Sequence, residues 1–584
     1  SGNYNSGGGV MEVSAYDSGS KRLFTVNGNS GNIEIINLTD PSNPVLISTI
    51  DMSPYGVAAN SVSVKNGILA AAIEAAVKQN DGNVVFFTAS TGAHLKTVAV
   101  GALPDMLVFS PDGNFVVVAN EGEPDDTYTN DPEGSISVID ISTGVLNATE
   151  TKINFNNYDG LENLLRADGI RIFGPGATTS KDLEPEYVTI SEDSKTAWVV
   201  CQENNTMVIV DLISKTILDL KPLGYKNHNS VGNGFDASDR NPTNPSTVIN
   251  ITNWPVRGLY MPDGIAHMRY DNQTYILTAN EGDSREYTGF NEELRIGSGS
   301  YPLDATSFPN AATLKLTANL GRLKTTKSLG NIDGDTDFDA IYSFGARSFS
   351  IWDSSMVRIY DSGDDIEQYI ATNFPTNFNA NHNTDNIMSS RSDDKGPEPE
   401  SVITATLGDS TYAFVGLERI SAVIVYNVTN PFKPKMVDYL TTRNFLEIPV
   451  STVGTGVGTG GDLGPEGLLF IEKENSPIDK ALLIVSYEVS GTIVIYELTE
   501  PTYPVTTDLF AETNTGIEPM KLYPNPVNGA VLNFSKMTSA FILNANGIQV
   551  AKVENATFVN VENLEKGLYF LKTDEGNVLK FIKE

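Results

Sequence analysis

The chain has 584 residues, 40% of them apolar, so it is long enough for at least two domains and apolar enough to form folded cores. Its net charge of −34, with 73 acidic against 39 basic residues, disfavours binding to nucleic acid or to anionic membranes. No stretch reaches the roughly 18 apolar residues of a membrane-spanning helix, so no direct membrane insertion is expected. The start at Ser1 without Met predicts a processed, exported chain.

A unit of two short strands recurs along the chain and predicts an all-β fold. In the pattern an apolar strand ends near an acidic residue, and a turn leads to a second strand that ends in Asp or Asn. Six copies lie at Leu23–Asn37, Leu69–Phe87, Phe115–Asp140, Ala197–Asp211, Tyr412–Asn427 and Leu482–Glu497. Tyr275–Glu281 carries only the first half of the unit, and Ile341–Asp353 resembles a divergent copy.

A shorter element, Pro followed by an acidic residue, precedes several of these units. It occurs at Pro104-Asp105, Pro185-Glu186, Pro262-Asp263, Pro399-Glu400 and Pro465-Glu466. A leading strand followed by two tandem strands is typical of a propeller blade. The repeats therefore predict a β-propeller, with seven blades favoured and eight possible, whose long insertions belong on loops at one face.

The composition changes near residue 500. We predict a propeller at 1–500, a linker at 501–518 and a small Ig-like β-sandwich at 519–584. This tail resembles the type A sorting domain of the bacterial type IX secretion system. The resemblance rests on four motifs, Tyr523–Pro526, Asn544–Gly547, Gly567–Phe570 and Lys580–Lys583. Within them, the candidate signal residues are Tyr523, Pro524, Asn525, Pro526, Gly567, Tyr569 and Lys583.

The tail resemblance implies recognition by the type IX secretion machinery. It also implies transit through the periplasm to the outside of a bacterium, where the chain is released or anchored on the outer-membrane surface.

The rest of the chain, from about residue 8 to 500, resembles the choice-of-anchor I family. The residues that carry this resemblance include Asp182–Tyr187, Tyr260–Asp263, Thr278–Tyr287, Tyr342–Ser348, Gly396–Glu400 and Gly416–Arg419. The family is similar to mesenchyme-specific cell-surface glycoproteins of biomineralising animals, and its members are often labelled alkaline-phosphatase-like. Membership implies no settled activity.

Two sets of acidic residues occupy equivalent positions in the repeats. One set follows the first tandem strand and contains Glu74, Glu121, Glu203, Glu281, Glu418 and Glu488; the other contains Asp105, Glu186, Asp263, Glu400 and Glu466. Radial repetition would bring both sets to one mouth of a central channel. Such a ring repels itself unless cations neutralise it, and oxygen ligands of this kind favour Ca²⁺ or Mg²⁺. The alternative is that each acid caps its own blade by accepting backbone N–H bonds.

Four arginines are interleaved with these motifs, namely Arg257, Arg285, Arg347 and Arg419. Together with a divalent metal they could bind phosphate or carboxylate groups. The alternative is internal ion pairing with the acidic residues.

A separate segment, Asn331–Asp339, alternates Asp at positions 333, 335, 337 and 339. The alternation is typical of a calcium loop, which makes Asp333, Asp335, Asp337 and Asp339 candidate ligands. An EF-hand is excluded because the Gly at the sixth position and the Glu at the twelfth are missing. A solvated acidic turn is the alternative.

These features predict a secreted, calcium-binding propeller that acts as a surface ligand-binding protein, with a ligand such as a glycan or a phosphate-containing group. The alternative is a calcium-dependent phosphoesterase with its site in the channel, because Gly396–Glu400 resembles a motif of phytase-like esterases. In that reading Glu203, Glu281 or Glu400 would hold the metal, and Arg285 or Arg347 would clamp phosphate.

Overall fold

The computed structural model describes residues 2–6, 10–447, 449, 459–499, 522–544, 549–573 and 578–583. The chain divides into two compact units, Ser1–Glu500 and Pro501–Glu584. The linker predicted at 501–518 lies outside the described residues, as do residues 545–547 of the predicted motif Asn544–Gly547. No described helix is both long enough and apolar enough to span a membrane.

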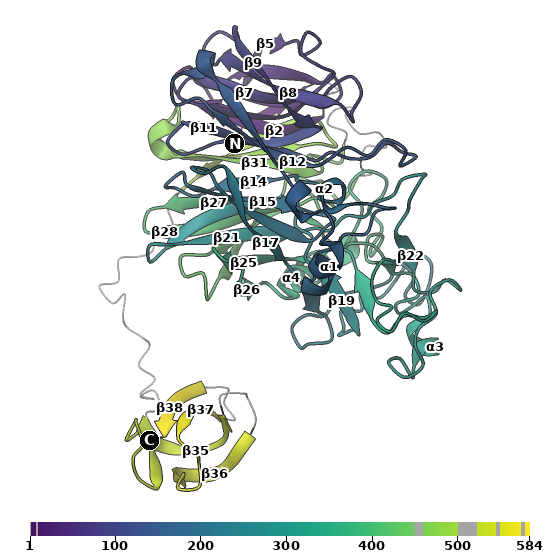
Figure 1. Cartoon of the computed structure of the whole chain (residues 1–584), viewed down its shortest axis with the longest axis vertical. Helices are drawn as coiled ribbons and strands as arrows, with labels where there is room; N and C mark the ends of the chain where they lie inside the picture. Colours follow the sequence, from purple (N-terminus) through teal and green to yellow (C-terminus); the bar gives the residue numbers. More distant parts are fainter. Residues whose placement is uncertain are drawn as a thin grey trace. The chain divides into compact units, whose positions relative to one another are not determined.

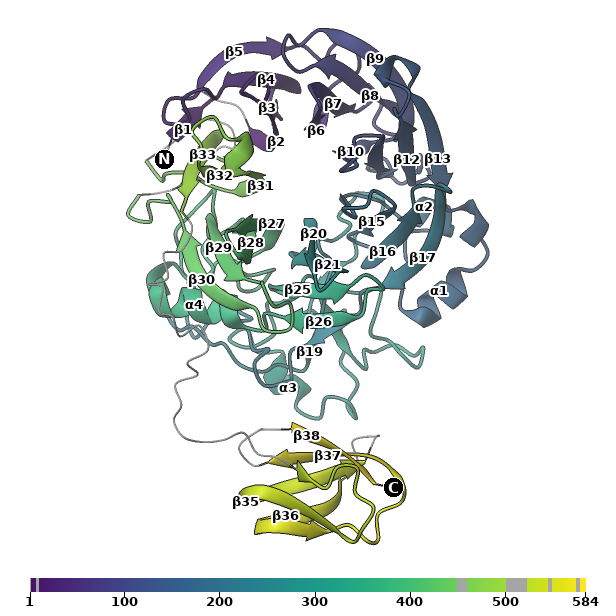
Figure 2. The same ribbon diagram turned by 90° about the vertical axis from the view of Figure 1, so that its left-hand side faces the viewer.

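Seven four-stranded antiparallel sheets of the described chain form the larger unit and radiate around a common axis (Figure 2). This confirms the predicted β-propeller with seven blades. From inner to outer strand, the first four blades are β2 (Met11–Asp17), β3 (Arg22–Asn27), β4 (Asn32–Asn37) and β5 (Val45–Ile50); β6 (Ala59–Lys65), β7 (Ile68–Ile73), β8 (Asp81–Thr88) and β9 (His94–Ala102); β10 (Pro104–Phe109), β11 (Phe115–Asn120), β12 (Ser135–Asp140) and β13 (Thr149–Asn154); and β14 (Val188–Ile190), β15 (Thr196–Cys201), β16 (Thr206–Asp211) and β17 (Thr216–Pro222).

The last three blades contain the largest insertion and the ring closure. They are β20 (Ile265–Tyr270), β21 (Gln273–Asn280), β25 (Ser348–Asp353) and β26 (Arg358–Asp361); β27 (Pro399–Leu407), β28 (Ser410–Leu417), β29 (Ala422–Asn427) and β30 (Lys435–Leu440); and β31 (Pro465–Ile471), β32 (Ala481–Tyr487), β33 (Thr492–Leu498) and the N-terminal strand β1 (Gly2–Asn5). Because β1 pairs with β33, the two ends of the propeller sequence share one sheet and close the ring.

One blade is split in the sequence, which is why the repeats left seven and eight blades both open. β21 pairs with β25, although the segment 281–347 separates them. The half unit at Tyr275–Glu281 and the divergent copy at Ile341–Asp353 are therefore the two parts of a single blade.

The middle strands of each blade are buried on both faces. In β11 and β15 all residues but the first are buried, because each blade packs between two neighbours. This explains why these strands read as continuous apolar runs rather than as alternating patterns.

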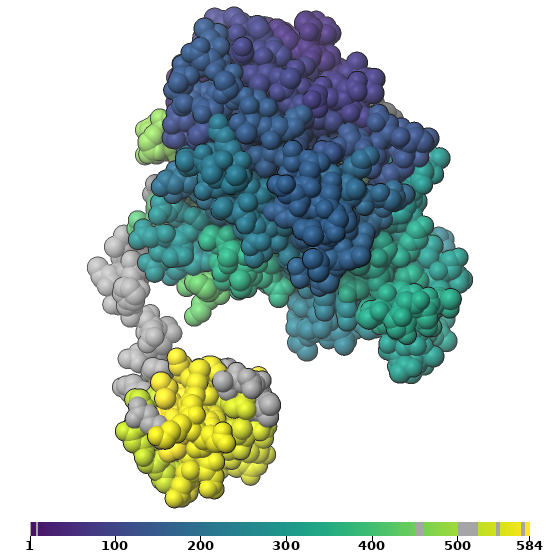
Figure 3. Space-filling model, viewed as in Figure 1, coloured from purple at the N-terminus to yellow at the C-terminus, as the bar shows by residue number. Residues whose placement is uncertain are grey.

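All long insertions leave the blades at the same end. Strand direction alternates within a blade, so the connections from second to third strand and from fourth strand to the next blade emerge at one face. That face carries α1 (Glu162–Asp168), α2 (Thr179–Asp182), β18 (Tyr225–Asn227), β19 (Val256–Leu259), β22 (Glu293–Arg295), α3 (Ala311–Leu314), β23 (Lys324–Thr326), β24 (Ile341–Ser343) and α4 (Asp365–Asn373). Figure 1 shows α1, α2, β22 and α3 on this side, and in Figure 3 the lobe around α3 protrudes from the body of the propeller.

The described part of the second unit is a small all-β domain. Its strands are β34 (Leu522–Tyr523), β35 (Val531–Asn544), β36 (Gln549–Asn560), β37 (Gly567–Thr573) and β38 (Val578–Lys583). They belong to one five-stranded sheet, in which β35 pairs with β34, β36 and β37. Three register shifts interrupt the β35–β36 pair. Bulges bend strands, so a single sheet can enclose this core as the two sheets of the predicted sandwich would.

The signal residues of the tail are joined to the last strand. Asn525 donates to the carbonyl of Lys580 (2.9 Å) and accepts from the backbone N–H of Ile582 (3.0 Å). Tyr569 stacks on Phe581 with ring centroids 5.5 Å apart. The opening and closing motifs of the domain thus form one structural element.

Candidate metal centre at the channel mouth

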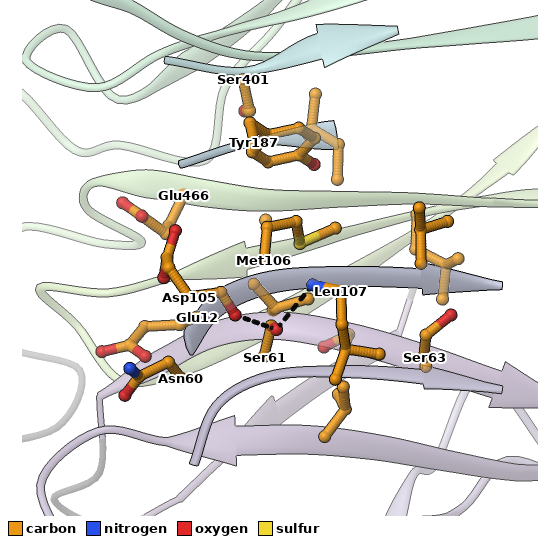
Figure 4. A pocket seen from close by; sticks show the side chains of 18 of the residues that line it. Glu12, Asn60, Ser61, Ser63, Asp105, Met106, Leu107, Tyr187, Ser401 and Glu466 are labelled. Atoms are coloured by element: carbon orange, nitrogen blue, oxygen red, sulfur yellow. Dashed lines mark hydrogen bonds between the residues drawn. The ribbon is translucent and has the colours of Figure 1, made fainter. Parts of the chain in front are cut away.

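A polar residue stands at or just before the start of each inner strand. It is the second residue of the strand in five blades and lies two residues before the strand in the other two. The seven residues are Glu12, Asn60, Asp105, Glu186, Asp263, Glu400 and Glu466. In five blades a register shift between the inner and second strands spans this residue, as between Pro399 and Val402. A bulge redirects the side chain that it contains. Figure 4 shows Glu12, Asn60, Asp105 and Glu466 grouped at one end of the channel.

The second acidic set lies at the same mouth. Its members follow the ends of the second strands, which run antiparallel to the inner strands. Pro104 pairs with Asn120 directly before Glu121, and Pro465 pairs with Tyr487 directly before Glu488. The set comprises Glu74, Glu121, Glu203, Glu281, Glu418 and Glu488, and the first blade has Gly28 at the equivalent position. The structure thus brings both predicted sets together.

Asp263, Glu400 and Glu466 form one close group of carboxylates at the mouth. Each offers a carboxylate oxygen, and these atoms lie within 4.8 Å of one another. Glu400 is only 9% exposed, and its Oε2 is buried without a hydrogen-bond partner. Among the described residues, none of the three makes an ion pair or accepts a backbone N–H, so the blade-capping alternative does not describe this group.

Burial and the repulsion between neighbouring carboxylates raise the pKa of the carboxyl groups around the mouth. Burial, followed by the charges of Glu281, Glu418, Glu466 and Asp263, raises the pKa of Glu400. Burial and the charges of Glu488 and Asp105 raise the pKa of Glu12 to about 8. For Asp105 the causes are burial and the nearby Glu123, and its pKa rises to about 7. The mouth therefore holds either protons or cations near neutral pH.

The channel behind this mouth is a pocket of about 480 Å³. Its walls are inner-strand residues such as Val62, Leu107 and Leu468, and Tyr187 also lines it (Figure 4). The carboxylates stand at the strand starts, and the wall beyond them combines apolar residues with serines such as Ser61 and Ser63.

A second group of acids carries its own cations. Glu281, Glu398 and Glu418 also have oxygens within 4.8 Å of one another. Lys395 pairs with Glu281 (2.5 Å), and Arg419 pairs with Glu398 (2.9 Å) and Glu418 (3.0 Å). Glu398 has a pKa held well below its ordinary value by Arg391, Arg419 and Lys395, which outweigh the effect of its burial. This group has no need of a metal ion.

Arg285 and Arg347 are used inside the protein. Arg285 pairs with Asp182 (2.6 Å) and Glu184 (3.0 Å). Arg347 pairs with Glu367 (2.8 Å) and donates to three backbone carbonyls. Both side chains are buried, so the ion-pairing alternative describes them.

The Asp-rich segment brings together only part of its predicted set. Asp337 and Asp339 have oxygens within 4.8 Å of one another and of Asp304, which sequence analysis missed. Asp333 and Asp335 lie outside this group and accept backbone N–H bonds within the turn, as Asp339 also does. Asp304 could not be found from the alternation because it lies far before it in the sequence, and the bridge between Leu303 and Phe338 places it there.

Sequence analysis also missed Glu12, Asn60 and Glu398. Met11 and Ala59 stand where other blades have Pro, so the pattern of Pro plus acid did not reveal the first two blades. The paired strands that follow each of them, together with the blade spacing, were the only remaining sequence signal for these two positions. Nothing in the local sequence distinguishes Glu398 from Glu400 as the residue that binds arginines.

Comparison with known proteins confirms both resemblances. Residues 12–431 match the sequence model of the choice-of-anchor I domain, and residues 521–584 match that of the secretion system C-terminal sorting domain. Gigasin-3a of Magallana gigas is 33% identical over 195 residues, which cover 31% of this chain and 65% of that protein. The mesenchyme-specific cell surface glycoprotein of Strongylocentrotus purpuratus is 26% identical over 327 residues, covering 49% and 41%. The chain thus spans less than two thirds of either relative.

Two solved structures that resemble this chain have low TM-scores. Hydrazine synthase of Kuenenia stuttgartiensis has a TM-score of 0.42 at 12% identity, covering 85% of this chain and 96% of its own. The β-propeller domain of Cps50 (Swd1) from Myceliophteria thermophila has a TM-score of 0.39 at 9% identity, covering 85% and 98%. The propeller assignment therefore rests on the seven sheets themselves.

Proposed function

Because the chain belongs to the choice-of-anchor I domain family and ends in a secretion system C-terminal sorting domain, it is a secreted or cell-surface bacterial protein, and we propose that its propeller binds Ca²⁺ at the channel mouth. The sorting domain implies recognition by the type IX secretion machinery. The cation would neutralise the mouth and hold the surrounding insertion loops in place for a surface ligand.

The observation that carries this proposal is the uncompensated group of Asp263, Glu400 and Glu466. Their oxygens lie within 4.8 Å of one another, and opposite ligands of a Ca²⁺ ion are about 5 Å apart. We propose Ca²⁺ rather than Mg²⁺ because Ca²⁺ accepts the irregular geometry of ligands that come from three different blades, whereas Mg²⁺ requires a near-ideal octahedron. Carboxylate oxygens are the ligands that such hard cations prefer.

We propose a second cation site at the Asp-rich turn. Its ligands would be Asp304, Asp337 and Asp339. Asp337 has a raised pKa, caused by its desolvation and by Asp335, Asp304, Asp339 and Asp333, and its Oδ1 is buried without a partner. A divalent cation would relieve this repulsion.

The phosphoesterase alternative has less support. It requires guanidinium groups that are free to clamp phosphate, and Arg285 and Arg347 already have internal partners. A binding role needs only the carboxylates and the loops that surround them.

Calcium titration of the chelator-treated full chain tests the proposal. We expect heat of binding in isothermal titration calorimetry, and we expect Glu400→Gln to weaken the channel site by at least about tenfold because one buried charged ligand is lost. Asp409→Asn is the matched control, since Asp409 is an exposed turn residue of the same blade. Equal affinity of Glu400→Gln and the parent chain would exclude the channel site, and calcium-dependent turnover of phosphoesters would restore the enzymatic alternative.

A further inference from the structure

The channel pocket combines acidic residues with apolar walls, and none of the described residues that line it is Lys, Arg or His. Its four carboxylates belong to Glu12, Asp105, Asp263 and Glu466. The proposed calcium site uses the last two. Among the described residues the first two form no ion pair, and Lys78, whose charge acts on Asp105, is paired with Glu123. Two carboxylates of the pocket therefore lack a counter-ion even when calcium is bound.

Glu12 and Asp105 share one wall of the pocket with Asn60. The three residues come from the first, third and second blades, and Figure 4 shows them at the same end of the channel. Nδ2 of Asn60 donates to the carbonyl of Pro104 (2.9 Å), so the atom that Asn60 can offer to a ligand is its carbonyl oxygen. This wall therefore offers hydrogen-bond acceptors and negative charge, which suit a cation that carries its own donors.

Aliphatic side chains line the pocket beyond this wall. Val62, Leu107 and Leu468 come from three different blades. Glu12 and Asp105 belong to no described group of three metal-ligating side chains whose ligand atoms lie within 4.8 Å of one another. A metal ion would gain nothing from the apolar wall. An aliphatic ammonium gains from both surfaces, because its head needs acceptors and its methylene chain packs on apolar side chains.

A hydroxyl without a partner lies on the other side of the pocket. Ser401 is only 6% exposed, and its Oγ is buried without a hydrogen-bond partner in the described part of the chain. Ser401 lines the pocket together with Tyr187, across the channel from Glu12 and Asn60 (Figure 4). Buried polar atoms are normally paired, so this hydroxyl independently points to a polar ligand in the pocket.

We propose that the channel pocket binds a linear aliphatic diamine. One ammonium group would lie among Glu12, Asn60 and Asp105, and the methylene chain would pack on the aliphatic wall. The second ammonium group would donate to Oγ of Ser401. The volume of about 480 Å³ is sufficient for a small ligand of this kind. This site does not depend on the proposed calcium site, because the two use different carboxylates.

The test is calorimetric titration of the chelator-treated full chain with cadaverine, with pentanediol and with ethylenediamine. Pentanediol, with a hydroxyl at each end, replaces both ammonium groups of cadaverine by neutral groups on the same chain. Ethylenediamine keeps both charges and has fewer methylene groups. We expect cadaverine to bind, and we expect the other two to bind at least about tenfold more weakly, since each lacks one of the two contributions.

Glu12→Gln should weaken cadaverine binding by at least about tenfold, because it removes one of the two carboxylates that face the ammonium group. The matched control is Asp409→Asn, which removes one negative charge from an exposed turn and should leave the affinity unchanged. Asp105→Asn provides a second variant with the same expected loss as Glu12→Gln. Thermal unfolding shows that each variant is folded before it is titrated.

Calcium distinguishes the diamine site from the calcium site. Glu400→Gln should weaken calcium binding while changing cadaverine binding less than Glu12→Gln does, and cadaverine should still bind at saturating calcium. The proposal is overturned if cadaverine does not bind, or if pentanediol or ethylenediamine binds as tightly. Equal effects of Glu12→Gln and Asp409→Asn, or complete displacement of cadaverine by calcium, would also overturn it.

Discussion

At the scale of single residues, the mouth of the channel is a set of like charges that the protein holds together. Glu400 has the charges of four other carboxylates around it and no cationic partner among the described residues. Glu418, one of the carboxylates that act on Glu400, forms an ion pair with Arg419. Even so, burial and the charges of Glu398 and Glu281 raise the pKa of Glu418 to about 8. Basic side chains therefore distinguish the two groups: the acids around Glu418 belong to an ion-pair network, whereas Glu400 and its neighbours remain open to a metal ion.

The raised pKa values predict that the calcium-free protein loses stability as the pH rises. Groups such as Glu12 and Glu418, with pKa values of about 8 in the folded state, keep protons there that the unfolded chain has already released. Their contribution is complete below the ordinary pKa near 4.5 and is lost as the pH rises through about 8, at roughly 1.4 kcal/mol per pH unit for each group. We expect chelated protein to unfold at a lower temperature at about pH 8.5 than at about pH 7.

Between about pH 7 and pH 8.5, the buried histidines do not oppose this loss of stability. His228 and His382 have lowered pKa values, caused by burial and by neighbouring cations, and act in the opposite sense only below about pH 6.5. Saturating calcium should remove most of the difference, because the cation takes the place of the protons. Differential scanning calorimetry measures the effect, and equal unfolding temperatures at both pH values in chelator would contradict the pKa pattern.

At the scale of elements, one feature recurs in five of the seven blades. The inner strand carries a bulged polar residue near its start, beside the end of the second strand. Sequence patterns predicted the position of the acidic residue where Pro precedes it, as at Pro104 and Pro399, but not the bulge. They did not predict it at Glu12, because a bulge depends on pairing between strands rather than on local sequence. The partners of Arg285 and Arg347 were also unpredictable, since those contacts join distant segments: Asp182 lies in the insertion after β13.

The Asp-rich turn gives a prediction at this scale. Asp304→Asn should reduce the number of calcium ions bound per chain by one, because it removes a carboxylate from the group with Asp337 and Asp339. Asp333→Asn should leave the number unchanged, since Asp333 lies outside that group. Equilibrium dialysis counts the ions. An effect of Asp333→Asn alone would favour the alternating ligand set expected from the sequence.

At the scale of the whole molecule, the fold was predictable and its elaborations were not. Seven repeats of paired strands specify the propeller, although a long insertion hid one blade by dividing it between Asn280 and Ser348. The face that bears the insertions could be predicted, because the chain leaves every blade there. The small sheet β18–β19–β24, which contains Arg257, has no repeat and no periodicity in the sequence, so only the structure revealed it.

Division into two units predicts that export and binding are separable. A chain that lacks Pro501–Glu584 should remain inside the cell envelope of a bacterium with a type IX system, while its purified propeller binds calcium as the full chain does. Immunoblots of cell fractions and of the medium, with the full chain as control, measure the first effect. Normal appearance of the truncated chain outside the cell would show that the tail is not the export signal.

The most direct test of the central claim is a crystal structure of the full chain or its propeller unit, soaked with Ca²⁺ and measured for anomalous scattering. The account predicts a peak bound by Asp263, Glu400 and Glu466, at calcium–oxygen distances of about 2.3 to 2.6 Å. A map at saturating calcium with no peak among these three carboxylates would contradict it.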